Sequence, residues 1–103
     1  MEYSEEDIPR ILEKVRKNPY GIKQTDHLII RSRDRFINLD LIYKKIITEA
    51  PIIIEKTIKQ SNKFLLIYKY TKLKDLCIAI YILNENEILL ITVIDKSAER
   101  RKK

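Results

Sequence analysis

The residues with the clearest chemical potential are His27, Arg31 and Arg35, which follow one another at intervals of four. At about 100° per residue, this spacing places the three side chains on one face of a helix, within an arc of about 80°. Guanidinium groups bind phosphate oxygens through paired hydrogen bonds, and imidazole exchanges a proton near neutral pH. The pattern therefore predicts a phosphodiester-binding site, with a solvated helix face of no function as the alternative.

RNA cleavage by attack of a 2′-hydroxyl needs a base, an acid and positive charge on the phosphate, but it needs no metal. His27 fits the proton-transfer role, and Arg31 and Arg35 fit the phosphate role. A single histidine leaves the second proton-transfer role open, and four tyrosines are candidates for it as well as for structural positions. They are Tyr43, Tyr68, Tyr70 and Tyr81. We expect Asp34 to orient one of the arginines.

Amino-acid composition argues against several other classes of functional site. The chain has 103 residues, enough for one domain, and 45% of them are hydrophobic. A single histidine and a single cysteine argue against a structural zinc site, and Gly21 as the only glycine argues against glycine-rich phosphate loops. We therefore predict no metal and no cofactor, and a buried Cys77. Because no apolar run approaches 18 residues, we expect a cytoplasmic protein with no membrane span and no signal peptide.

The net charge of +6 is unevenly distributed. Residues 10–74 carry sixteen basic and six acidic side chains, whereas residues 1–9 and 75–95 are acidic. Clustered positive charge favours a polyanionic partner such as RNA. Arg33 lies at the rim of the His27 face, and residues 96–103 form a basic tail. The predicted nucleic-acid contacts are therefore Arg33, Arg100, Arg101, Lys102 and Lys103, with a solubilising tail as the alternative.

Periodicity predicts three helices in the first half of the chain. The first spans about residues 4–18, with Ser4 or Asp7 as its cap. The second begins at Thr25 or Asp26 and runs to about residue 35, with an apolar side opposite His27. That apolar side comprises Leu28, Ile29, Ser32 and Phe36. The third follows an Asn38 cap and ends before Pro51.

After residue 51 the pattern changes to runs rich in Ile, Val, Tyr and Thr, which predict strands at 52–59, 64–70, 76–83 and 88–95. Short connections favour an antiparallel meander. We therefore predict one α+β domain over residues 1–95, in which two or three N-terminal helices pack on a four-stranded, mainly antiparallel sheet.

The last two apolar runs predict association. They offer apolar side chains to both sheet faces, while the helices cover one face well. The final run is also expected to be an edge strand without lysine to protect it. A homodimer, or a partner chain that adds a strand or helix, would cover these surfaces.

The segment DHLIIRSRDRFINLDLI, which leads into a meander ending LLITVI, resembles a small domain family that is similar to the BrnT and RelE/ParE toxin group. The resemblance covers about residues 25–95, and its motif positions are His27, Arg31, Arg35 and Thr92. It implies a RelE/ParE-like fold, ribonuclease activity and an antitoxin partner. The sequence departs from that pattern in its first helix and in the lack of basic and aromatic residues at 88–95. The resulting hypothesis is a toxin-like, metal-independent endoribonuclease, with a non-catalytic nucleic-acid-binding or protein-interaction module as the alternative.

Overall fold

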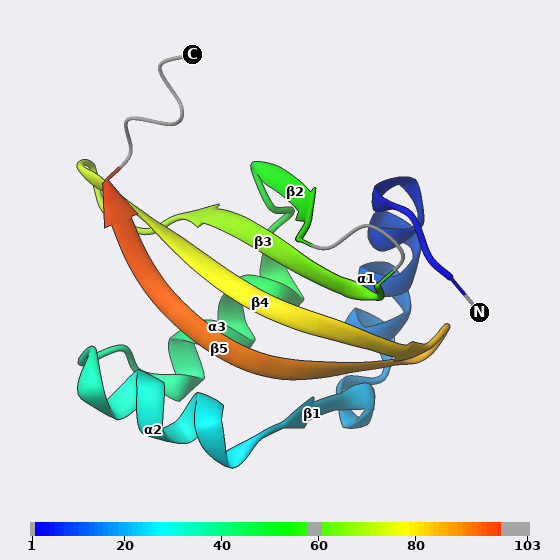
Figure 1. The fold of residues 1–103 in the computed structure, drawn as a ribbon, viewed down its shortest axis with the longest axis horizontal. Helices are drawn as coiled ribbons and strands as arrows, with labels where there is room; N and C mark the ends of the chain where they lie inside the picture. Colours follow the sequence, from blue (N-terminus) through cyan, green and yellow to red (C-terminus); the bar gives the residue numbers. More distant parts are fainter. Residues whose placement is uncertain (1, 58–60, 98–103) are drawn as a thin grey trace.

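The computed structural model describes residues 2–57 and 61–97, which form three α-helices, two short 3₁₀ helices and a five-stranded sheet (Figure 1). The helices are α1 (Ile8–Lys17), α2 (Asp26–Asp34) and α3 (Leu39–Thr48). The strands are β1 (Ile22–Gln24), β2 (Ile53–Lys56), β3 (Lys63–Lys69), β4 (Lys74–Asn84) and β5 (Glu87–Ser97). The predicted α+β class is confirmed. Residues 98–103, with four of the predicted nucleic-acid contacts, lie outside the described residues.

The sheet has the order β1-β5-β4-β3-β2, and the meander of β2 to β5 is antiparallel as predicted. The expected strand count of four was wrong. The additional strand, β1, pairs in parallel with β5 and places Ile22 beside Ile88, so the sheet is mixed. Three residues are too few to show a strand period, and this strand forms because β5 offers it a partner.

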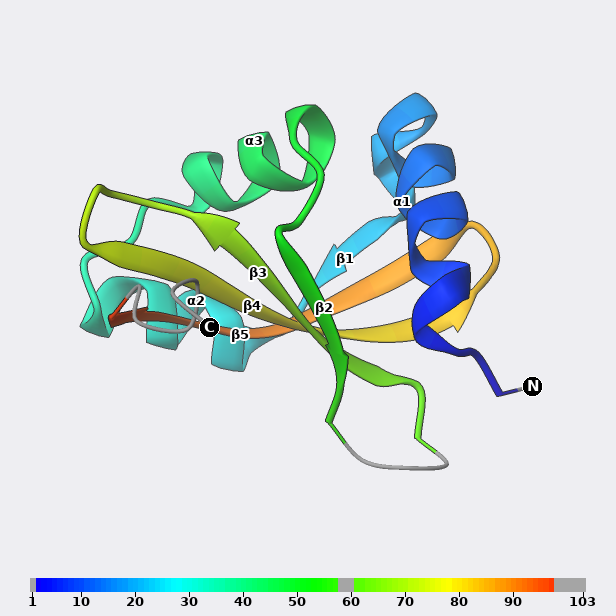
Figure 2. The ribbon, with the colours of Figure 1, turned by 90° about the horizontal axis from the view of Figure 1, so that it is seen from above.

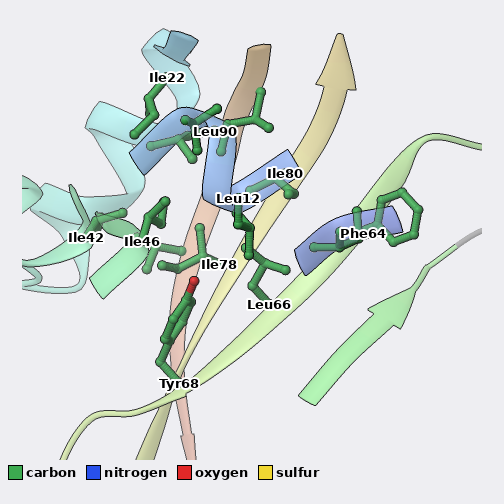
Figure 3. Packing of buried hydrophobic residues seen from close by; sticks show 14 of the residues in the cluster. Leu12, Ile22, Ile42, Ile46, Phe64, Leu66, Tyr68, Ile78, Ile80 and Leu90 are labelled. Carbon is green, nitrogen blue, oxygen red and sulfur yellow. The ribbon is translucent and has the colours of Figure 1, made fainter. Parts of the chain in front are cut away.

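Two helices cover one face of the sheet. Figure 2 shows α1 and α3 on the same side, with α2 beside the β5 edge. The core lies between α1, α3 and this face, and Figure 3 shows Leu12, Ile46 and Leu66 meeting there. Arg16 joins the two helices, since its guanidinium donates to the Ile46 and Glu49 carbonyl oxygens at the end of α3. Cys77 is buried, as predicted.

A β-bulge changes which residues of β5 face the core. Ile80 lies opposite Leu90, but the preceding residue of β4, Ala79, lies opposite Thr92. The additional residue, Ile91, reverses the alternation along the strand. Val93 is consequently buried in the core, and Thr92 lies on the other face.

Thr25 connects this bulge to α2. Its hydroxyl oxygen accepts from the Leu28 backbone N–H at 3.1 Å and caps the helix. The same hydroxyl lies 3.0 Å from the Leu90 carbonyl oxygen and 3.2 Å from that of Ile91, and it donates to this pair. The start of α2 is thereby fixed to β5 at the point where the strand is irregular.

The prediction that β5 is an unprotected edge was wrong. β1 pairs with its first half, through residues 88–90, and α2 lies against the rest. Arg35 completes the cover, because its Nη1 donates to the Val93 carbonyl oxygen at 2.8 Å. A backbone acceptor of β5 that another chain would otherwise pair with is therefore occupied.

Thr25→Val should lower the free energy of unfolding by about 1–2 kcal/mol, because valine keeps the shape but loses the cap and the bond to β5. Thr25→Ser keeps the hydroxyl and should cost less than half as much. Urea denaturation of both variants measures the difference. Equal losses would show that the methyl group of Thr25, and not its hydroxyl, stabilises this junction.

The predicted association now depends on the second sheet face alone. α1 and α3 lie on the other face. On this one the alternation along the strands places Ile67, Cys77 and Ala79, which are buried, and Leu83, which is exposed. Leu83 is 45% exposed and Tyr81, on the same face, is 39% exposed. We expect a homodimer at micromolar concentration, which sedimentation velocity would detect. A monomer whose face binds no apolar dye would contradict this expectation.

Candidate nucleic-acid interface

Helix α2 carries three of the predicted site residues and brings two of them, His27 and Arg31, into contact. Leu28 and Ser32 are buried, so the opposite side of the helix faces outward. His27 is exposed and Arg31 is half-buried. Arg31 Nε donates to His27 Nε2 at 3.4 Å, so this imidazole nitrogen acts as an acceptor. These two residues therefore share one side of the helix, as their four-residue spacing predicted.

Arg35 does not extend the row as expected. The helix ends at Asp34, and Arg35 has left the helical conformation, with φ −103° and ψ 6°. Its guanidinium turns toward β5 and bonds the Val93 carbonyl oxygen. One part of this guanidinium is therefore used to hold the helix against the sheet, and only its remaining N–H groups can bind an anion.

None of the four candidate tyrosines contacts His27 in the described residues. Tyr68 is fully buried beneath α1 and α3, and burial raises the pKa of its hydroxyl (Figure 3). Tyr43 donates to Gln24 Oε1 at 3.2 Å, and burial raises its pKa as well. Tyr81 lies on the open sheet face, and Tyr70 packs at the edge of the core. Within the described residues, none of these tyrosines is therefore placed to act with His27 as a second proton-transfer group.

The remaining predicted residues are dispersed. Asp34 makes no ion pair with Arg31 or Arg35 in the described residues, so it does not orient them as expected. Arg33 is exposed on α2. Thr92, half-buried, lies on the open face of β5 opposite Ala79.

The end of α2 has a conformation that the periodicity did not indicate. The Ile37 backbone N–H donates to the Ser32 carbonyl oxygen and the Phe36 N–H donates to that of Arg33, which is a Schellman motif. This motif needs a left-handed residue, usually glycine, but here Phe36 adopts it with φ 55°. The reversal turns Phe36 outward, 93% exposed, and buries Ile37 in its place. The expectation that Phe36 packs on the apolar side of the helix was wrong.

A groove lies beside Phe36. It has a volume of about 540 Å³, and it is formed by the end of α2, the turn between β3 and β4, and the last part of β5. Its lining residues are Arg35, Phe36, Tyr70, Thr71, Lys72, Leu73, Lys74 and Asp95. The sequence did not indicate Phe36, Lys72 and Leu73 as site residues, because a solvated turn and a helix end have no hydrophobic periodicity.

The groove has an excess of positive charge. Lys74 Nζ donates to Asp95 Oδ2 at 3.1 Å, and this bond lowers the pKa of the Asp95 carboxyl. Arg35 adds to the effect at longer range. Since this carboxylate is matched by Lys74, the positive charges of Arg35 and Lys72 remain to attract an anion.

No cluster of three or more His, Cys, Asp or Glu residues that could hold a metal ion occurs in residues 2–57 and 61–97. No helix within those ranges is long and apolar enough to cross a membrane.

Phe36→Gly should raise the free energy of unfolding by about 0.5–1 kcal/mol. Glycine removes the cost of a left-handed side chain, about 1–2 kcal/mol, and the greater freedom of the unfolded chain offsets part of this gain. Phe36→Ala keeps the cost and should have little effect. Thermal and urea denaturation of both variants test this, and a clear loss of stability in Phe36→Gly would mean that the ring contributes to packing.

Comparison of the chain with protein-family models, with curated proteins and with solved structures finds no match. The resemblance to the toxin group therefore stays an expectation, and the functional argument depends on the geometry of α2 and the adjacent groove.

Proposed function

We propose that this protein binds RNA through the outward side of α2, by contacts with the phosphate backbone. The observation that supports this most directly is that the arginines on this side form no ion pairs in the described residues. In the described residues, Arg10 and Arg16 of α1 pair with carboxylates, whereas no ion pair involves the arginines of the α2 segment. Those arginines are Arg31, Arg33 and Arg35.

Unpaired guanidinium groups close together in sequence repel one another, and a polyanion relieves that repulsion. Arg31 approaches an imidazole nitrogen of His27, and Arg35 approaches a backbone carbonyl oxygen. Both groups keep their full positive charge. Phosphate contacts of this kind give affinity and orientation without reading sequence.

The second candidate function is the endoribonuclease. The contact between His27 and Arg31 favours it, because an imidazole that can take a proton lies beside a group that can bind phosphate. An antitoxin would be the partner in that case. None of the four candidate tyrosines lies beside His27 in the described residues, and this favours binding without cleavage.

Replacing Arg31 and Arg33 by alanine should weaken RNA binding about tenfold or more at 0.1 M salt, and it should lower the salt slope by about one to two. Fluorescence anisotropy of a labelled RNA over a range of salt concentrations measures both quantities. Lys14→Ala with Lys17→Ala on α1 removes the same charge from another exposed helix and serves as the control. Equal effects of the two double variants would show that net charge alone attracts RNA.

The same RNA reports on cleavage. If the protein is a ribonuclease, the wild type should fragment the RNA and His27→Ala should bind it without fragmenting it. Intact RNA with the wild-type protein, together with no growth arrest on overexpression, would exclude the enzyme hypothesis and leave the binding function in place. No RNA affinity in the wild type would exclude both.

A further inference from the structure

We propose that the groove beside Phe36 holds one unpaired base of single-stranded RNA, with the base stacked on the Phe36 ring and the adjoining phosphates bound by Arg35 and Lys72. This inference rests on the proposed RNA-binding function and makes it specific for single strands. An exposed aromatic ring offers a base a surface for stacking that does not depend on sequence.

The conformation of Phe36 is the first argument. A bulky residue in the left-handed region has a backbone cost, and a ring that is 93% exposed recovers none of it by burial in the monomer. The Schellman motif that holds the backbone in this conformation fixes where the ring projects. A strained, exposed aromatic residue on a fixed turn is the arrangement expected where a ligand contacts the ring.

The opposite wall is the second argument. Leu73, on the turn between β3 and β4, is 76% exposed and lines the same groove as Phe36. Hydrogen bonds shape that turn, since the Thr71 N–H donates to the Lys74 carbonyl oxygen and the Leu73 N–H donates to Thr71 Oγ1. Two apolar side chains from separate, fixed segments thus border a space within the size range of small-ligand sites.

Charge is the third argument, and it selects RNA over an apolar peptide. Arg35 and Lys72 line the groove and form no ion pair in the described residues. Asp95, the one carboxylate in the lining, bonds to Lys74 and interacts with Arg35 only at longer range. The positive charge continues from the groove onto α2, where Arg31 lies one helical turn before Arg35. A strand with its phosphates along α2 would therefore bring a base to Phe36.

The test compares single-stranded oligoadenylate of about 12 nucleotides with the duplex it forms with oligouridylate. Phe36→Gly should weaken binding of the single strand about tenfold or more, and Phe36→Tyr should retain it, because stacking needs only a ring. Neither variant should change binding of the duplex, whose bases are not available for stacking. Tyr20→Ala removes another exposed aromatic residue, 87% exposed and outside this groove, and should have no effect.

A spectroscopic measurement reports on the ring directly. The chain has six tyrosines but no tryptophan, so Phe36→Trp introduces a single tryptophan, which can be excited selectively. The single-stranded oligomer should quench the tryptophan emission, and the duplex should leave it unchanged. Each RNA form is added at a concentration that saturates the protein. Equal quenching by both forms would indicate general proximity to nucleic acid and would overturn the stacking proposal.

The outcomes separate this inference from the proposed function. If all variants bind both RNA forms like the wild type, the groove takes no base, while binding through Arg31 and Arg33 stands. If Phe36→Gly loses affinity for an acidic, apolar peptide but not for RNA, the groove is a protein-docking site and the inference is wrong. If the wild-type protein binds neither RNA form, the proposed function fails and this inference fails with it.

Discussion

The hydroxyl of Thr25 makes the contact on which the candidate RNA-binding side of this molecule depends. It caps α2, and it bonds to β5 where Ile91 interrupts the regular pairing. A cap alone would start the helix without fixing its direction, and a bond to the strand alone would leave the Leu28 N–H without a partner. One side chain does both, so the positions of His27 and Arg31 are set by a junction a few residues away from them.

Arg35 has a structural role, because it bonds to β5, and under the proposed function it also binds phosphate. The sheet must protect β5, which lies second in the order but has only a three-residue neighbour on its outer side. Helix α2 lies along the part of β5 that β1 does not reach. The bond from Arg35 to the Val93 carbonyl oxygen attaches the C-terminal end of α2 to this strand. The segment that carries the basic residues is consequently bonded to β5 at both of its ends, so its backbone is already in place before a ligand binds.

Local signals allowed most of the fold to be predicted from the sequence. The Asn38 cap and the change of period after Pro51 correctly located α3 and the four-stranded meander. What the sequence could not indicate depends on contacts between distant segments. β1 exists because β5 offers it a partner, and the bulge at Ile91 leaves no mark in a run that is apolar at nearly every position. The reversal at Phe36 was missed because glycine, its usual signal, is absent there.

The candidate site likewise has one part that could be predicted from the sequence and one that could not. The spacing of His27 and Arg31 was sufficient to predict that they share one side of the helix, because one turn of a regular helix determines it. The next step of four residues failed, since it crosses the end of α2, where backbone geometry and not side-chain periodicity decides direction. The chain keeps Phe36 at a position where glycine would be easier to accommodate, and it keeps that ring out of the core. Stability does not account for an exposed phenylalanine at this position. The groove beside Phe36 is therefore a stronger candidate for a binding site than the surroundings of His27.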